Sequence, residues 1–172
     1  MVRKQIVMVL FFLLFVQMLA LGMGKAEPFT KKILGNFSFN DLKRAQFYLN
    51  STLTLTRVVP HEETKDVQEG ILSIVNGETV ETILITDKTG GELMTLNKNV
   101  LGICFSAHNE DRILYFTEEL IGTEYFLSAS GSKVKYGQYE YKVSKKPKLL
   151  VQFSEEFNRE KKVEKEEGRK VL

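Results

Sequence analysis

The sequence predicts a small all-β domain, an antiparallel β-barrel or sandwich with one short N-terminal helix and a charged C-terminal tail. Between residues 38 and 153 the chain falls into about nine short runs rich in β-branched and aromatic residues, separated by tight polar turns. The 172 residues include only three prolines, and one segment of this region has clear helical spacing. Short strands joined by short turns are typical of barrels and sandwiches.

The first 26 residues have the pattern of a secretory signal peptide. A basic end, Arg3 and Lys4, precedes an apolar run over 6–21, and the small residues Gly24 and Ala26 offer a cleavage site. The alternative is an uncleaved anchor, but the run is shorter than the ~20 apolar residues that a spanning helix needs. We therefore expect a periplasmic or secreted bacterial protein whose mature chain has no transmembrane span.

Removal of the signal peptide changes the charge balance. The full chain has 24 Lys and Arg against 22 Asp and Glu, a net charge of +2. The first 26 residues contain three of these cations and no acid, so the mature chain has 21 cations against 22 acids. A chain of net charge −1 has no general attraction for phosphate, so we expect no nucleic-acid partner.

Cys104 is the only cysteine, and it lies in the most apolar run of the chain. No intramolecular disulfide can form, which argues against a eukaryotic extracellular module and fits a bacterial periplasm or cell exterior. A buried apolar setting raises a thiol pKa, so we expect an inert core cysteine.

A central hairpin is predicted by two apolar runs, 100–105 and 112–117, on either side of a polar turn. Neither run alternates strictly, so we expect both of its faces to be covered. A five-residue loop would pair Phe105 with Ile113, Ile103 with Tyr115 and Gly102 with Phe116.

The segments before this hairpin are assigned in order. Residues 27–37 read as an extended lead-in, and Leu42, Ala45 and Leu49 predict a helix over 40–48 with Ser38 or Asn40 as its cap. The strands expected next are 52–56, then 71–75 and 79–86 across Asn76-Gly77-Glu78, then 92–96.

The segments after it end in a charged tail. A strand over 123–129 leads to a second hairpin, in which a Gly137-Gln138 turn pairs Tyr136 with Tyr139, Val134 with Tyr141, Lys135 with Glu140 and Lys133 with Lys142. The last strand is 148–153. Residues 154–172 form a mixed-charge run, which we expect to be weakly helical or disordered.

Two polar loops contain the only candidate metal ligands, and their pattern is weak. They are His61 and Glu62 in one loop and His108, Glu110 and Asp111 in the other. The chain has no His-Glu-x-x-His segment and no histidine pair at metal spacing, so we expect neither a metal nor another cofactor.

Catalytic patterns are missing as well. The sequence has no Gly-x-Ser-x-Gly elbow, no phosphate loop and no dinucleotide-binding fingerprint. We therefore expect a non-catalytic binding module of the cell envelope, whose partner is an envelope protein or polymer. The main alternative is a β-barrel that carries a small molecule or lipid, because tyrosines could line a cavity.

The segment from Ser130 to Tyr136 resembles the Ser-Gly-x-x-Tyr segment of periplasmic lysozyme inhibitors, which are small secreted β-barrels. Four residues separate Gly131 from Tyr136 in this chain, whereas the motif has two at that point, and the disulfide of that family is absent. No residue roles are therefore transferred. The resemblance adds a periplasmic enzyme inhibitor as a further alternative.

The second hairpin is the expected interaction surface. Its register places Lys133, Lys135 and Lys142 on one face, with Tyr139 at the turn. The lysines could contact an anionic envelope polymer, or they could serve only to keep an edge hairpin soluble.

Overall fold

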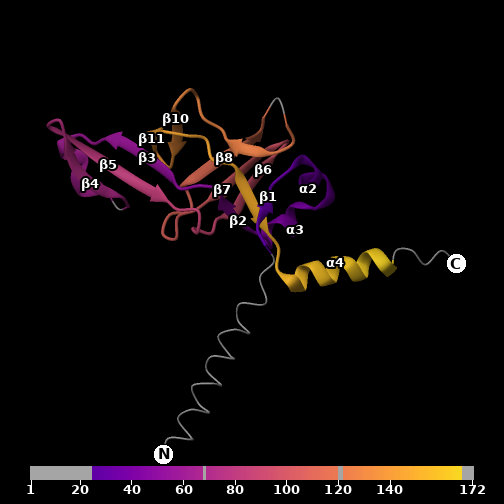
Figure 1. The fold of residues 1–172 in the computed structure, drawn as a ribbon. Helices are drawn as coiled ribbons and strands as arrows, with labels where there is room; N and C mark the ends of the chain where they lie inside the picture. Colours follow the sequence, from indigo (N-terminus) through magenta and orange to yellow (C-terminus); the bar gives the residue numbers. More distant parts are fainter. Residues whose placement is uncertain (1–24, 68, 120–121, 168–172) are drawn as a thin grey trace, which may run out of the picture. The chain divides into compact units, whose positions relative to one another are not determined.

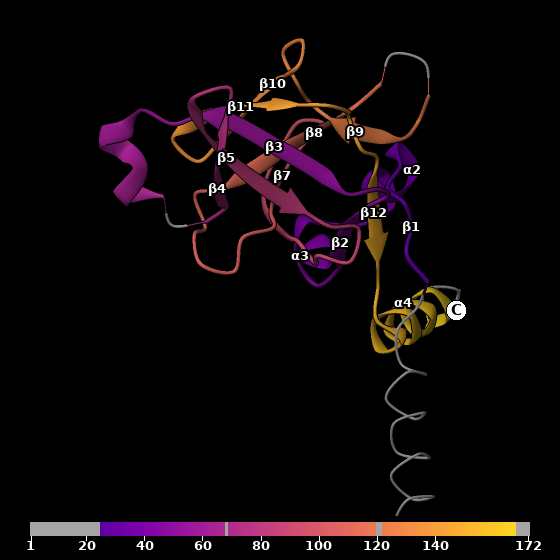
Figure 2. The ribbon, with the colours of Figure 1, turned by 60° about the vertical axis from the view of Figure 1, so that its left-hand side comes forward.

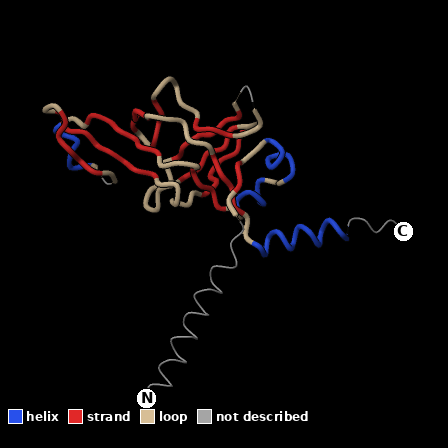
Figure 3. The backbone as a smooth tube through the Cα atoms, in the orientation of Figure 1, coloured by secondary structure: helices blue, strands red, loops and turns tan. Residues whose placement is uncertain are grey.

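The computed structural model describes residues 25–67, 69–119 and 122–167 (Figure 1). Within residues 26–151 the chain is mostly β, as predicted, and its strands form three antiparallel sheets. The predicted signal peptide lies outside the described residues, except for its last two positions. Figure 3 shows that strands dominate residues 26–151 and that this range contains few helical turns.

The largest sheet has five strands in the order β10-β11-β3-β5-β4. In β3, leucines are buried and threonines are half-buried, so the predicted alternation is confirmed. The β4–β5 hairpin turns at Asn76 and Gly77, whose φ angles are 52° and 82°. The predicted tight turn is therefore present, but Glu78, which was expected in the turn, pairs with Val75 and begins β5. The strands are β3 (Leu53–Val58), β4 (Ile71–Val75), β5 (Glu78–Ile85), β10 (Lys133–Tyr136) and β11 (Tyr139–Val143), and the 3-10 helix η1 (His61–Asp66) lies between β3 and β4 in the sequence.

The second sheet contains the predicted central hairpin. Its order is β6-β7-β8-β9, with β6 (Glu92–Asn97), β7 (Val100–Cys104), β8 (Ile113–Glu118) and β9 (Tyr125–Leu127). The hairpin exists, but the predicted register is wrong by one residue, because Ile103 pairs with Leu114 and Gly102 with Tyr115.

Burial explains the observed register. The observed register places four fully buried side chains on one face of the hairpin, namely Leu101, Ile103, Leu114 and Phe116. A shift of one residue would turn one strand's apolar set to the opposite face. The opposite face is covered only in part, since 44% of Tyr115 is exposed, so the expectation that both faces of β8 are covered is wrong.

The third sheet joins the two ends of the domain. Its order is β1-β12-β2, with β1 (Glu27–Pro28), β2 (Gln46–Leu49) and β12 (Leu149–Gln152). No sheet closes on itself among the described residues, so the predicted barrel remains a prediction (Figure 2).

The helix predicted over 40–48 is wrong in its second half. Helix α3 (Phe39–Lys43) begins with a capping box between Ser38 and Asp41 and ends at Lys43. After Arg44 and Ala45, residues 46–49 form β2, where Phe47 and Leu49 are buried and alternate with half-buried neighbours, a period of two rather than 3.6.

The lead-in is also more regular than expected. Only Glu27 and Pro28 form a strand there, and helix α2 (Lys31–Asn36) follows. The Thr30 side chain caps α2 by accepting a hydrogen bond from the Ile33 N–H at 3.3 Å.

The C-terminal segment forms a structural unit of its own. Helix α4 (Glu155–Glu167) begins after Ser154, whose Oγ accepts the Phe157 N–H at 3.1 Å. The Phe153 and Phe157 rings stack at 4.9 Å. The predicted tail is thus helical through residue 167, and residues 168–172 lie outside the described part. No helix in the described ranges is both long and apolar enough to cross a membrane.

Candidate functional site

The predicted register of the β10–β11 hairpin is confirmed at all four pairs. Its lysines, Lys133, Lys135 and Lys142, are exposed on one face together with Glu140. Lys133 Nζ lies 2.6 Å from Glu140 Oε2, so one of the three positive charges is paired in place. Tyr139 is half-buried at the turn and does not share that face with Lys142.

A wider basic segment, residues 133–146, contains this hairpin. Lys145 and Lys146 follow β11 and are exposed, so five exposed lysines accompany a single acid, Glu140. The two additional lysines were not singled out from the sequence. Their signal was present, since Ser144-Lys145-Lys146 directly continues the basic hairpin.

A buried ion pair lies under the hairpin and holds Tyr139 in place. The Arg57 Nε donates to Glu81 Oε2 at 2.5 Å, and Glu81 is fully buried. The Tyr141 hydroxyl donates to the same oxygen at 3.0 Å, and the Arg57 guanidinium lies 3.6 Å from the centre of the Tyr139 ring. Arg57 also contacts Glu63 Oε2 at 3.2 Å. The network therefore connects β3, β5 and β11.

A second buried arginine fixes the β7–β8 loop. Arg112 contacts Glu69 Oε2 at 3.0 Å, and Ser106 Oγ donates to the other oxygen of Glu69 at 2.5 Å. The guanidinium also lies 5.4 Å from the centre of the Tyr136 ring. A cavity of about 150 Å³ opens here, lined by Asn109, Asp111, Arg112, Tyr136, Gly137, Gln138 and Tyr139.

The buried tyrosines make the fold sensitive to alkaline pH. Burial raises the pKa of Tyr125, Tyr136 and Tyr141 above the usual range. These phenols ionise in the unfolded chain from about pH 10, so the unfolded state then binds fewer protons and the free energy of unfolding falls. We expect a melting temperature that is level to about pH 9 and then decreases.

Thermal melts between about pH 8 and pH 11 measure this effect. Above about pH 10 the free energy of unfolding obtained from these melts should decrease less steeply in the Tyr136→Phe variant than in the wild type, by up to about 1.4 kcal/mol per pH unit. A slope for Tyr136→Phe equal to that of the wild type would contradict the assignment of this pH dependence to the buried tyrosines.

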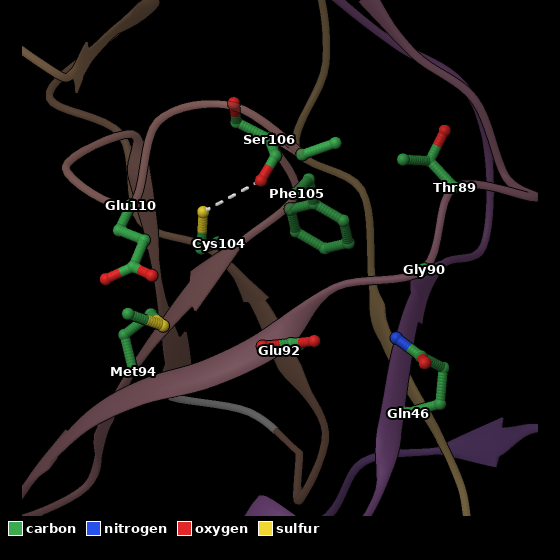
Figure 4. Close-up of a pocket in the computed structure, with 10 residues that line it drawn as sticks. Gln46, Thr89, Gly90, Glu92, Met94, Cys104, Phe105, Ser106 and Glu110 are labelled. Atoms are coloured by element: carbon green, nitrogen blue, oxygen red, sulfur yellow. Dashed lines mark hydrogen bonds between the residues drawn. The ribbon is translucent and has the colours of Figure 1, made fainter.

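An acidic cleft of about 410 Å³ lies at the end of β7 (Figure 4). Glu92 reaches it from β6, Glu110 from the β7–β8 loop and Gln46 from β2. None of the described residues that line it is basic. Carboxylate oxygens accept hydrogen bonds and carry negative charge, so the lining suits a small cation better than an anion or a lipid.

The Cys104 thiol lies on the wall of this cleft. It donates to the Ser106 carbonyl at 3.5 Å, as the dashed line in Figure 4 shows. Burial raises the pKa of Cys104, and the negative charges of Glu69, Glu92 and Glu110 raise it further. The thiol is therefore protonated at neutral pH and is a weak nucleophile, as expected from the sequence.

The five weak metal candidates lie on two exposed segments. His61 and Glu62 belong to η1, whereas His108, Glu110 and Asp111 lie in the β7–β8 loop. Among the described residues, no three potential ligands come together in a group that could hold a metal ion.

Comparisons with protein-family models, with curated proteins and with solved structures gave no match to this chain. The class that the geometry defines is a mostly β domain with a basic segment on one hairpin and an acidic cleft beside its central sheet.

Proposed function

We propose that this chain is an exported, non-catalytic binding module of the bacterial cell envelope that attaches to an anionic envelope polymer. Export is supported by the signal-peptide pattern of residues 1–26. The non-catalytic role is supported by the protonated Cys104 thiol and by the absence of catalytic motifs from the sequence.

The basic segment is the observation that carries this proposal. Five exposed lysines face one acid there, although the mature chain as a whole is close to neutral. Lysine ammonium groups are mobile point charges on long stems, which suit a repeating polymer with phosphate or carboxylate groups better than one rigid ligand. Each exposed contact is weak, so attachment depends on several acting together.

The alternatives have narrower support. A small-molecule carrier is supported by the acidic cleft only for a cationic ligand, because two carboxylates line it. A closed barrel with an apolar lumen would extend this alternative to lipids. An enzyme inhibitor would bind a protein, so a target enzyme would be retained in place of a polymer.

Retention on isolated cell envelopes tests the proposal. Changing Lys133, Lys135 and Lys142 to Gln should reduce retention at low salt by about tenfold, since exposed ionic contacts contribute about 0.2–1 kcal/mol each. High salt should remove wild-type retention, because the screening length falls from about 8 Å at physiological ionic strength to about 3 Å at about 1 M salt.

The matched control changes Lys32, Lys88 and Lys98 to Gln, three exposed lysines outside the basic segment. It alters the net charge equally and should keep wild-type retention. Equal loss in both variants would indicate a net-charge effect, and unchanged retention in the first would leave its lysines with a solubility role only.

A further inference from the structure

The two edges of the five-stranded sheet are built differently. The β10 edge carries Lys133 and Lys135, and edge lysines hinder pairing with another chain. The opposite edge, β4, reads Ile-Leu-Ser-Ile-Val and contains no charge and no proline. One edge is therefore protected in the usual way and the other is left open to pairing.

Strand β4 is exposed on both faces. All five of its residues are exposed, including Ile71 at 67% and Ile74 at 80%, which point to opposite faces of the strand. Figure 1 shows β4 at the free edge beside β5. On the face of Ile71 the neighbouring strands add two more exposed apolar side chains, Val58 and Leu84, which are 53% and 54% exposed. Exposed apolar side chains gathered near an open sheet edge mark an interaction surface.

The strand is complementary to itself. If two copies pair antiparallel around a two-fold axis at Ser73, Ile71 lies opposite Val75 of the second copy, and Leu72 lies opposite its Ile74. Apolar residues then meet apolar residues on both faces. The segment 70–77 carries no charge, so the second copy brings no like charge against the first.

We propose that this protein forms a dimer in which the β4 strands of two copies pair antiparallel around Ser73. The two sheets then become one ten-stranded sheet. A foreign strand could use the same main-chain edge, but a second copy also matches the side chains on both faces. A five-residue strand is only about 17 Å long, so the interface falls at the small end of the range and the dimer should dissociate on dilution. This inference does not depend on the proposed function.

Cysteine cross-linking tests the register. At the two-fold axis the two Ser73 Cα atoms would lie about 4.5–5.5 Å apart, within the range that a disulfide spans. Ser73→Cys should therefore form a covalent dimer under mild oxidation. In the Ile71→Cys control the two sulfurs would belong to residues about 13 Å apart along the strands, so little covalent dimer should form. The wild type, whose Cys104 is 7% exposed, gives the background.

Sedimentation velocity over a concentration series tests the dimer without cross-linking. Ile74→Lys should weaken dimerisation at least about tenfold, because it places a charge opposite Leu72 of the second copy. Tyr115→Lys, at an exposed position of the second sheet, should leave it unchanged, and circular dichroism checks that both variants fold. A monomeric wild type at millimolar concentration, or equal cross-linking at positions 71 and 73, would overturn the proposal.

Discussion

Replacement of Arg57 by Met is expected to lower the free energy of unfolding by about 3–5 kcal/mol. The change leaves the Glu81 carboxylate, which is 0% exposed, without its ionic partner. No hydrogen-bond partner of Glu81 Oε1 lies among the described residues, and Tyr141 would be the remaining donor to Oε2. A buried charge that loses its partner retains its full desolvation cost. Urea denaturation measures the loss as a shift in midpoint at constant slope.

Two further variants separate the cost of an unpaired buried charge from the loss of an ion pair in itself. Arg57→Met combined with Glu81→Gln removes the buried charge but keeps an oxygen to accept the Tyr141 hydroxyl, so it should be more stable than Arg57→Met alone. Lys133→Met breaks an exposed pair, and it should cost at most about 1 kcal/mol. The single variant Glu81→Gln completes the comparison. If the destabilisation of the double variant equals the sum of those for Arg57→Met and Glu81→Gln, the two side chains do not interact and the network stabilises through packing instead.

The hairpins whose turns are short could be predicted from sequence. Asn76-Gly77 and Gly137-Gln138 each leave two residues to reverse the chain, and such turns set the register of the strands that they join. The lysine face followed directly from that register. The longer loop between β7 and β8 has no such constraint, and its conformation depends on Arg112 and Glu69, 43 residues apart in sequence.

Other features depend on tertiary packing that a local pattern does not specify. Leu42, Ala45 and Leu49 have a spacing compatible with a helix, but the pairing of Gln46–Leu49 in the third sheet makes these four residues a strand. The buried ion pair did have a signal: Arg57 continues the leucine face of β3, and Glu81 shares its face with Ile83 and Ile85. Opposite charges on the apolar faces of two adjacent strands indicate a buried pair.

Truncation of Phe116 to Ala should also cost about 3–5 kcal/mol of unfolding free energy. Its ring is 0% exposed, pairs across the hairpin with Leu101 and lies edge-on to Phe105 with centroids 6.3 Å apart. The surrounding sheet is fixed by hydrogen bonds on both sides of β8, so the cavity cannot collapse completely. Equilibrium urea denaturation gives the value.

The neighbouring residue supplies the matched control and a test of the register. Tyr115→Ala removes an aromatic side chain of similar size that is 44% exposed and rests against Gly102, so it should cost about 1 kcal/mol. The register first expected would place Tyr115 opposite Ile103, on the face that Leu114 occupies here. If Tyr115→Ala proved as destabilising as Phe116→Ala, the hairpin would have to pair one residue out of the register described, because a one-residue shift exchanges the faces of the strand.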